Sequence, residues 1–525
     1  MGSIERTMRT RDPSAVEPRR GKGNPWASLR CEHPVSPFRA SPRTAEVARC
    51  FGLSTQQATL VIAEGAEIRL GPGRIVLLLG PSGGGKSSAL RKIVEQYCQA
   101  ALVQRIAFPE GAAIIDRIAP TASFSDAVST LTACGLGDAH LWIRPFHTLS
   151  EGERFRARLA QAAALHATTD GVGPLLCDEF CSGLHRRAAK AISFNLRRLA
   201  TRRGLSLVLA TSNDDILFDL QPDTIVHFSG GGAAAVEERP TPRPRSLSIL
   251  RKLRIEPGRK RDYDAFAAMH YRATDELGFV DKVFVMREVG GDPLGIVVYS
   301  HPPMELALRN RATESRFSRD PAALNRGVRI LRRLVVHPDL RGCGAGHHLV
   351  RTTLPLVGTE YVECLASMGA FNPVFEKAGM ERIGQCEQPA ACRRAIAELE
   401  AIGVDPAATD FLTQVHRQRR VRVIVAREVY NWYQATTGGG ETRVARQSPE
   451  FLAQTFRGLI GSRPVCYLWR RSTPTRTRTS PKEEPLPDGR GSVPRSVRRS
   501  SPAPPKRKQR RGSGRRSTLK QVPSR

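Results

Sequence analysis

The sequence feature that most constrains the fold is a glycine-rich turn, GPSGGGKS at residues 80–87, placed between an apolar run and a helix-like run. The apolar run, Ile75–Leu79, is typical of a strand that is buried on both faces. The run Ser88–Gln96 after the turn has a helical pattern. Further apolar runs at Pro174–Cys177 and Leu205–Ala210 predict additional strands of one parallel sheet. We therefore expect an α/β domain built on this strand, turn and helix.

The turn also fits the phosphate-loop pattern G-x-x-x-x-G-K-[ST] at every fixed position. Its glycines let backbone N–H groups surround phosphates, and the start of the following helix adds a favourable dipole. Lys86 is expected to reach the β- and γ-phosphates, and the hydroxyl of Ser87 is expected to ligate Mg²⁺. The expected phosphate contacts are Gly80, Ser82, Gly83, Gly84, Gly85, Lys86, Ser87 and Ser88.

Two later segments complete a resemblance to ABC-type ATPases. Residues 149–153, LSEGE, resemble the LSGGQ signature of that family and precede a helical run, Arg154–Leu165. The strand Pro174–Cys177 then ends in Asp178 and Glu179. The resemblance implies that the protein binds and hydrolyses ATP, with Mg²⁺ held by Asp178 and Ser87. It also implies that Glu179 and Lys86 are catalytic.

In that family two ATPase domains enclose ATP between the phosphate loop of one and the signature of the other. The sequence holds one copy of each motif, so the resemblance implies a homodimer or an unseen partner. Ser150 and Gly152 would then contact the γ-phosphate bound to the partner, and Glu153 is expected among the nucleotide-binding residues.

The sequence departs from the ABC pattern at three places. The strand Leu205–Ala210 is followed by TSND at residues 211–214, where the family has a histidine. Ala107–Glu110 occupies the region in which the glutamine loop is expected. Only 61 residues separate Ser87 from Leu149, which is short for an ATPase that couples to membrane subunits. The ATP-binding subunit of an ABC transporter is therefore the least favoured alternative function.

A second glycine-rich turn, RGCGAG at residues 341–346, follows the predicted strand Val328–Val336. It resembles the acetyl-CoA motif of GNAT acetyltransferases, Q/R-x-x-G-x-G/A. Asn372–Met380 resembles a later helix of that family, and a helix at Tyr263–Gly278 and strands at Val283–Glu288 and Gly295–Tyr299 match its upstream half. The alternative is an ordinary strand–turn–helix connection. The resemblance implies that acetyl-CoA is bound by Val335, Val336, Arg341, Gly342, Gly344 and Gly346.

The residues that would carry out acyl transfer are less well marked. Phe375 stands where many of these enzymes have a tyrosine that protonates the departing thiolate. Glu363, His337 and Cys364 are candidate bases, and we expect each of them to be structural. Cys343 has no identifiable base partner, so we interpret it as a small loop residue. The sequence does not name the acyl acceptor.

The net charge of +31 suggests a nucleic-acid partner, so its distribution matters. Residues 471–525 carry 17 basic and 3 acidic side chains, and residues 1–45 carry 9 basic and 4 acidic ones. Both segments are rich in Pro, Ser, Gly and Arg, which predicts disorder. The alternative function is an ATP-gated factor that binds or modifies RNA or DNA, with the tails contacting nucleic acid or ribosome.

Composition also limits the location. We find no run of about 18 apolar residues and no secretory signal, so we expect no membrane insertion. The 11 cysteines contain no C-x-x-C pair, which favours reduced thiols and a cytoplasmic protein.

The predicted fold class is α/β: an ABC-type ATPase domain followed by an α+β GNAT acetyltransferase domain, with disordered basic tails. This combination resembles a predicted soluble bacterial and archaeal family. The strand-like run Val421–Val425 leaves the fold of its segment open. The predicted parts are a disordered segment at 1–43, the ATPase domain at 44–236, a linker at 237–245, the acetyltransferase domain at 246–400, an extension of uncertain fold at 401–470 and a disordered tail at 471–525.

Overall fold

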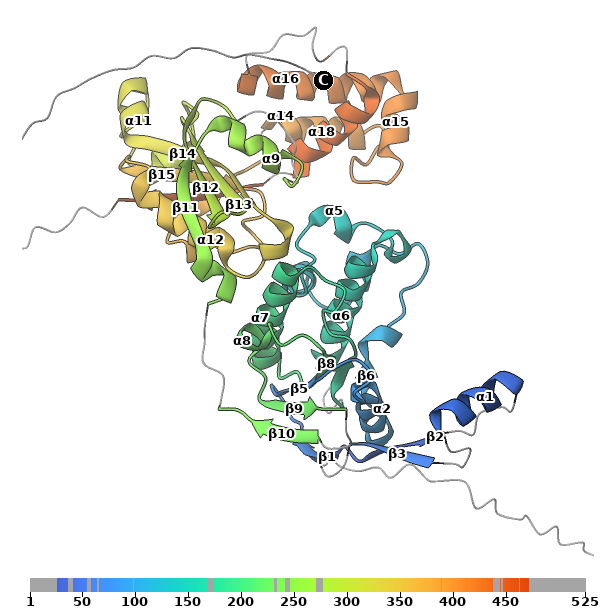
Figure 1. Ribbon diagram of the computed structural model, residues 1–525. Helices are drawn as coiled ribbons and strands as arrows, with labels where there is room; N and C mark the ends of the chain where they lie inside the picture. The colour runs from blue at the N-terminus through green and yellow to red at the C-terminus, as the bar shows by residue number, and fades with distance from the viewer. Residues whose placement is uncertain are drawn as a thin grey trace, which may run out of the picture. The chain divides into compact units, whose positions relative to one another are not determined.

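A computed structural model of the chain (Figure 1) describes most of residues 26–471. The described ranges are 26–35, 41–53, 58–63, 66–97, 99–167, 173–230, 234–240, 246–270, 277–388, 390–437, 444, 447–461 and 463–471. All of these described residues belong to one structural unit. The predicted disordered tail therefore lies, except for Arg471, outside the described residues, as does the linker core at 241–245.

The first glycine loop belongs to a six-stranded sheet in which all described neighbours are parallel except the pair β10 and β9. Across the sheet the strands are β10 (Ala234–Glu238), β9 (Thr224–Phe228), β5 (Ile75–Leu79), β8 (Leu207–Thr211), β7 (Leu175–Cys177) and β6 (Ala101–Leu102). The predicted strands at 75–79, 174–177 and 205–210 are thus confirmed as neighbours in one α/β sheet.

Helices cover both faces of this sheet because successive side chains of β5 point in opposite directions. Ile75 and Leu77 pack into the core beneath α6 and α7, whereas Val76 and Leu78 pack against α2. Figure 1 shows α6 and α7 rising from one side of the strands. The helices of this region are α2 (Lys86–Gln96), α3 (Ile114–Arg117), α4 (Phe124–Ala133), α5 (Ala139–Trp142), α6 (Glu151–Ala167), α7 (Arg186–Arg203) and α8 (Leu217–Leu220), with the short 3₁₀ turns η1 (Val103–Arg105) and η2 (Phe146–Thr148).

The prediction of disorder for residues 1–43 is wrong for Trp26–Val35. β1 (Trp26–Ser28) pairs with β4 (Glu67–Arg69), and β2 (Cys31–Val35) pairs with β3 (Ala58–Ala63). Ala27 and Leu29 are fully buried in the core that contains α2. The strands are short and lie in a Pro- and Arg-rich context, so composition alone does not reveal them. The helix α1 (Pro42–Phe51) follows, close to the predicted Ala45–Phe51.

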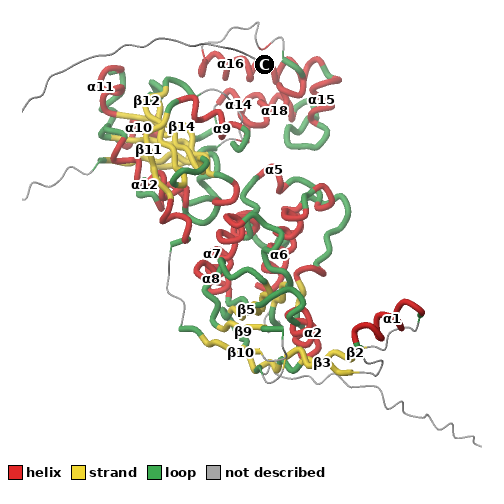
Figure 2. Tube along the Cα trace, viewed as in Figure 1, coloured by secondary structure: helices red, strands yellow, loops and turns green. Residues whose placement is uncertain are grey.

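The second glycine loop belongs to a seven-stranded mixed sheet (Figure 2). Across this sheet the strands are β11 (Leu253–Gly258), β12 (Val280–Glu288), β13 (Pro293–Ser300), β14 (Val328–Val336), β15 (Tyr361–Ala366), β17 (Val465–Arg470) and β16 (Glu381–Gln385). β14 and β15 are parallel, and the other paired neighbours are antiparallel. Ile296 and Val298 face one core, and Val297 and Tyr299 face the other, so both faces of β13 are buried.

The predicted boundary at residue 400 does not coincide with the end of this sheet. β17 lies between β15 and β16, although about 80 residues separate it from β16 in sequence. The intervening segment forms the helices α14 (Ala390–Glu400), α15 (Phe411–Arg417), α16 (Arg419–Thr437) and α18 (Pro449–Gly461), which Figure 1 shows gathered together. These helices share a core of their own.

The interpretation of Val421–Val425 as strand-like is wrong, because this run lies within α16. Val421, Ile424, Val425 and Val429 are buried in the helical core at helical spacing. The packing of this face against α14, α15 and α18 overrides the preference of β-branched residues for strands.

The predicted helix at Tyr263–Gly278 is only partly described. The structure has the 3₁₀ turn η4 (Lys260–Tyr263) and α9 (Asp264–Ala267), and residues 271–276 lie outside the described part. The remaining elements are η3 (Ser248–Lys252), α10 (Ala307–Ala312), α11 (Pro321–Gly327), η5 (Pro338–Leu340), α12 (Ala345–Thr353), η6 (Leu354–Leu356) and α13 (Val374–Lys377). In the described part of the chain, no helix combines the length and the apolar character needed to cross a bilayer.

Candidate functional site

The first loop turns sharply from the end of β5 into α2. Gly83 has φ 76° and Gly85 has φ 100°, a left-handed conformation that glycine adopts without strain. Gly85 is the N-cap of α2 and has no side chain that could accept hydrogen bonds from the first backbone N–H groups of the helix. A Cβ at Gly80 would lie 2.3 Å from the carbonyl oxygen of Phe228 on β9, so the close strand approach also requires glycine here.

Lys86 folds back over the loop. Its Nζ donates to the carbonyl oxygens of Gly80 at 2.8 Å and Pro81 at 2.6 Å. Partial burial lowers the pKa of Lys86, and the carboxylates of Asp178 and Glu179 oppose this effect. The three predicted residues therefore lie close enough to interact electrostatically, although nearly a hundred residues separate them in sequence.

The acid pair follows the fully buried strand β7. The Asp178 carboxylate accepts a hydrogen bond from the backbone N–H of Glu179 at 3.0 Å, and Glu179 is exposed. Glu179 has φ 45° and Cys181 has φ 57°, which are strained values for residues with side chains. The N–H of Phe180, between them, donates to the carbonyl of Ala210 on β8 at 2.7 Å and holds this turn against the sheet.

A glutamine that sequence reasoning missed contacts this acid pair. Gln104 lies in η1, directly after β6, and its side-chain amide donates to the carbonyl oxygen of Asp178. Its Oε1 accepts from the N–H of Asp178 at 3.4 Å. The glutamine loop was expected near Ala107–Glu110. The available signal was a polar residue directly after a short strand that pairs with β7, but the two-residue strand β6 is too short to recognise from its pattern.

The segment after β8 reaches the same edge of the sheet as the phosphate loop, because Thr211 pairs with Leu79 in parallel register. The segment has no histidine, as the sequence indicated. The N–H of Asn213 donates to the hydroxyl of Thr211 at 3.2 Å. Asp215 binds Arg186 at the start of α7, and the guanidinium lowers the pKa of this carboxyl. Ser212 and Asn213 are therefore neutral polar residues that lie after β8, at the sheet edge that carries the phosphate loop.

The signature-like residues form the cap of α6. The N–H of Ser150 donates to the Glu153 carboxylate at 2.9 Å, and the N–H of Glu153 donates to the Ser150 hydroxyl at 3.4 Å. This reciprocal pair is a capping box. A Cβ at Gly152 would lie 2.9 Å from the side chain of Leu184, so the helix start packs closely on the turn that leads into α7. Ser150 and Glu153 thus bond to each other rather than to the phosphate loop.

The oxygen donors beside Lys86 fit Mg²⁺. The Ser87 hydroxyl and the Asp178 carboxylate are hard ligands of the kind that Mg²⁺ uses. In the described residues, no group of three or more His, Cys, Asp and Glu side chains could hold a metal ion by itself. Mg²⁺ bound with phosphate oxygens and water needs only one or two protein ligands, so this sparse set suffices.

A cavity of about 480 Å³ opens where β14 and β15 part. The strands pair from Val328 with Tyr361 to Leu331 with Cys364, and pairing ends there. Beyond this point β14 keeps β13 as its neighbour on one side. Its residues Leu334–Val336 line the cavity on the other side. An extended ligand therefore has access to the edge of β14 here, except at the carbonyl oxygen of Val336, which accepts a hydrogen bond from Arg341.

The second glycine loop borders this cavity. Gly342 has φ 81°, and Gly344 has φ 100° and caps α12 without a side-chain hydrogen bond. A Cβ at Gly346 would come within 3.2 Å of Val374, so a larger residue would crowd α13. Val335 and Val336 both line the cavity; Val336 is partly buried, and Val335 is buried and also packs into the core behind the sheet.

Arg341 holds this loop in place. Its guanidinium donates to the carbonyl oxygens of Val336 at 3.0 Å, Gly137 at 3.1 Å and Met269 at 2.6 Å. Burial lowers its pKa, which the nearby Asp138 opposes. The guanidinium predicted to bind cofactor thus supports the loop through backbone carbonyls.

The candidate bases have structural partners. Glu363 is fully buried and lies 3.3 Å from Arg309, which also donates to the carbonyls of Pro303 and Met304. His337 accepts from the N–H of Asp339 at 3.3 Å, and burial lowers its pKa. Burial raises the pKa of the Cys343 thiol to about 12, so it stays protonated.

A tyrosine outside the predicted acetyltransferase segment lies next to Phe375. The ring of Tyr467 on β17 is 5.3 Å from the ring of Phe375. Its hydroxyl donates to the Glu376 carboxylate at 2.7 Å, and the carbonyl oxygen of Gly369 lies 3.2 Å away as an alternative acceptor. Sequence reasoning missed it because no local signal places β17 in the middle of this sheet.

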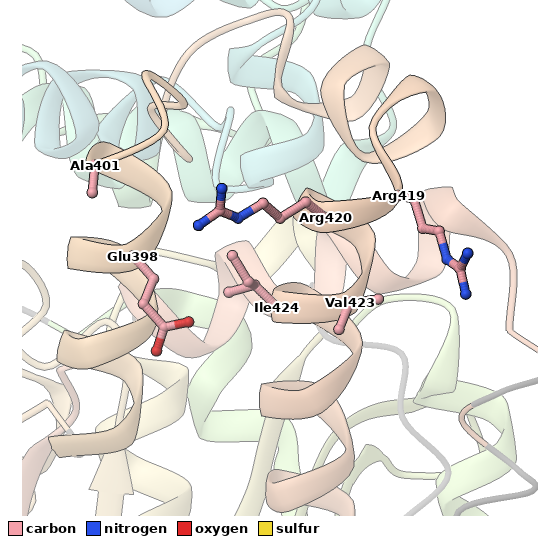
Figure 3. Close-up of a pocket in the computed structure, with 6 residues that line it drawn as sticks. All are labelled: Glu398, Ala401, Arg419, Arg420, Val423 and Ile424. Carbon is pink, nitrogen blue, oxygen red and sulfur yellow. The ribbon is translucent and has the colours of Figure 1, made fainter.

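An open hollow of about 600 Å³ lies between α14 and α16 (Figure 3). Figure 3 shows Arg420 reaching from α16 toward Ala401, which directly follows α14, whereas Arg419 points away. Glu398 binds Arg427 through both carboxylate oxygens at 3.1 Å. No residue predicted as functional lines this hollow.

Solved structures of ABC cassettes are similar to part of this chain. The dimeric MJ0796, a bacterial ABC transporter cassette, is 16% identical with a TM-score of 0.28, over 34% of this chain and 92% of that chain. The structure of cbiO1 from Clostridium perfringens, part of the ABC transporter complex cbiONQ, is 17% identical with a TM-score of 0.27, over 34% of this chain and 81% of that chain. A post-hydrolysis MJ0796 dimer bound to ADP and Pi is 15% identical with a TM-score of 0.28, over 35% of this chain and 94% of that chain. No model of a protein family matches the chain. Likenesses of this size say nothing of function, which has to come from the residues of the chain itself.

Proposed function

We propose that residues 44–236 form an ABC-type ATPase domain that binds and hydrolyses ATP. The observation that carries this proposal is the position of Lys86, whose ammonium lies on the carbonyls of Gly80 and Pro81 and within electrostatic reach of Asp178 and Glu179. The lysine follows β5 and the two carboxylates follow β7, the strands on either side of β8. A phosphate-binding lysine and two carboxylates at one edge of a sheet are what phosphoryl transfer to water requires.

The roles follow from the chemistry of each group. Lys86 exchanges its carbonyl partners for phosphate oxygens and stabilises the charge that develops on the transferred group. Glu179, exposed at the end of β7, orients the attacking water and accepts its proton. Ser87 and Asp178 would hold Mg²⁺, which would supply neutralisation of the phosphate charge. Gln104 fixes the backbone of Asp178 and so positions both carboxylates.

We propose further that two copies of the chain enclose the nucleotide. One phosphate loop and one signature-like segment are present, and the latter already caps α6 through Ser150 and Glu153. The capping box uses the N–H groups of Ser150 and Glu153, so an anion supplied by the partner would bind at the N–H groups of Glu151 and Gly152.

For the second sheet we propose acyl transfer from acetyl-CoA, as in GNAT enzymes. The support is the single parallel pair, β14 and β15, whose separation opens the cavity beside a glycine loop that starts α12. A pantetheine arm carries amides that can pair with the free edge of β14, and a pyrophosphate suits the N–H groups at the helix start. The transfer joins the acyl carbon to an acceptor amine, releases the thiol of CoA and removes a proton from the amine.

Equilibrium binding tests the two halves separately. A fluorescent ATP analogue should bind the wild type and Lys92→Ala, an exposed lysine of α2, but should bind Lys86→Ala at least tenfold more weakly. Labelled acetyl-CoA, offered with candidate acceptors that include tRNA, should release free thiol only with intact protein. A Gly346→Leu variant that keeps its thermal stability should lose CoA binding, because its side chain enters the cavity beside Val374. Retained binding by this variant would argue against the acyl-CoA site.

A further inference from the structure

The cavity beside β14 is strongly cationic. Its lining contains no Asp or Glu among the described residues that form it. The cations of the lining are Arg198, Arg202, Arg332, Arg333, Arg341 and Lys377. A concave surface with one sign of charge focuses the field and attracts ligands of opposite charge. The cavity is therefore suited to an anion.

Two of these cations, Arg198 and Arg202, belong to α7 of the ATPase domain. The guanidinium of Arg198 lies 5.5 Å from the centre of the Phe194 ring, and Nε of Arg202 donates to the carbonyl oxygen of Arg198 at 3.3 Å. Both residues lie in the last two turns of α7, where the helix dipole partly offsets their charge. The contacts hold the two guanidinium groups on one helix end at the cavity.

The basic groups at this end of the cavity repel one another, which lowers their pKa values. Partial burial lowers the pKa of Lys377 on α13, and Arg198 and Arg202 lower it further, whereas Glu376 opposes the shift. Partial burial and Arg202 also lower the pKa of Arg198. Burial lowers the pKa of His347 on α12, and Arg351, Lys377 and Arg198 add to that effect. An anion bound among these groups would relieve the repulsion.

We propose that Arg198 and Arg202 bind phosphate groups of the ligand that occupies this cavity, so that the ATPase domain supplies part of the acyl-CoA site. The inference rests on the proposed acyl-CoA function of the second sheet. CoA carries a pyrophosphate and a 3′-phosphate, and the glycine loop before α12 can hold only the group that lies at the helix start. The arginines of α7 hold the other phosphate.

Calorimetric titration of the full chain with CoA, 3′-dephospho-CoA and pantetheine tests this assignment. Arg198→Ala and Arg202→Ala should each weaken CoA binding by about tenfold or more, because each removes a charge-assisted contact. Arg198→Lys should recover part of the loss, since it keeps the charge. Arg203→Ala is the matched control, because Arg203 lies beside Arg202 on α7 but outside the cavity lining.

The three ligands separate the possible outcomes. If α7 holds the 3′-phosphate, the variants and the wild type should bind 3′-dephospho-CoA equally. If the variants instead bind both CoA and 3′-dephospho-CoA more weakly than the wild type, the arginines of α7 contact the pyrophosphate. Pantetheine affinity should not change in any variant. Equal CoA affinity of wild type, Arg198→Ala and Arg202→Ala would overturn the role of α7 and leave the acyl-CoA function intact. A wild type that does not bind CoA at all would overturn both, and thermal melts show that each variant is folded.

Discussion

Arg186 and Arg198 lie twelve residues apart on the single helix α7, which separates them by about 18 Å along the axis. Arg186 binds Asp215, which follows β8 at the edge of the sheet that carries the phosphate loop. Arg198 lines the cavity of the second sheet. Because most of the inner face of α7 is buried between these ends, we expect a shift at one end to be transmitted to the other.

This relationship predicts that the two ligands influence each other's binding. A non-hydrolysable ATP analogue should change the CoA affinity of the wild type about fivefold to tenfold, and CoA should change the affinity for the analogue by the same factor. Calorimetric titrations with and without the second ligand measure both factors. Lys86→Ala should abolish the effect and Lys92→Ala should keep it. CoA affinity that does not respond to the analogue would contradict coupling through α7.

Gln104 is predicted to position the acid pair. Gln104→Met keeps the length of the side chain but removes the hydrogen bonds to both backbone groups of Asp178. We expect kcat for ATP hydrolysis to fall about tenfold with little change in nucleotide affinity, because the loop that binds phosphates is untouched. Steady-state hydrolysis and analogue binding separate the two quantities. An unchanged kcat would show that the acid pair holds its position without this contact.

The buried pair Arg309 and Glu363 predicts a large effect on stability. Arg309→Met removes the cation that favours the charged form of Glu363, so at neutral pH this buried carboxyl must stay charged without a partner or take up a proton, and either should lower the free energy of unfolding by about 3–5 kcal/mol. The double variant Arg309→Met/Glu363→Gln should recover much of this loss, because no charge then remains buried. Urea denaturation at neutral pH measures both variants. A double variant as unstable as the single one would mean that the charge is not the cause.

The same carboxyl predicts a pH dependence of stability. Burial raises the pKa of Glu363 to about 7, and Arg309 opposes the shift only in part. The folded state holds this proton more tightly than the unfolded state. The stabilisation is therefore fully present below about pH 4.5 and is lost as the pH rises through about 7. Between about pH 5 and pH 8 the wild type should lose stability relative to Glu363→Gln, which does not titrate. This prediction would be contradicted if the difference in unfolding free energy between the wild type and Glu363→Gln did not change with pH, or if it increased in favour of the wild type as the pH rises.

The contiguous parts of the candidate sites could be predicted from the sequence. The loop at residues 80–87 and the acids Asp178 and Glu179 each follow an apolar strand directly, so local pattern alone locates them. Likewise the helix after the signature-like segment begins at Glu151 and includes the whole predicted run.

The parts that depend on pairing between distant segments could not be predicted. Gln104 is placed by the pairing of the very short strand β6 with β7. Tyr467 reaches Phe375 only because β17 inserts between β15 and β16 after a helical segment. In α16, Val421 and Ile424 show that a β-branched run can still follow helical spacing, a signal that the local composition concealed.

ATP hydrolysis by the purified chain tests the central claim most directly. Phosphate release should be Mg²⁺-dependent in the wild type and in Lys92→Ala, and at least a hundredfold slower in Glu179→Gln, because removal of a general base has that effect. Glu179→Gln should still bind ATP, whereas Lys86→Ala should lose both binding and hydrolysis. Hydrolysis that persists at the wild-type rate in both Lys86→Ala and Glu179→Gln would contradict the account.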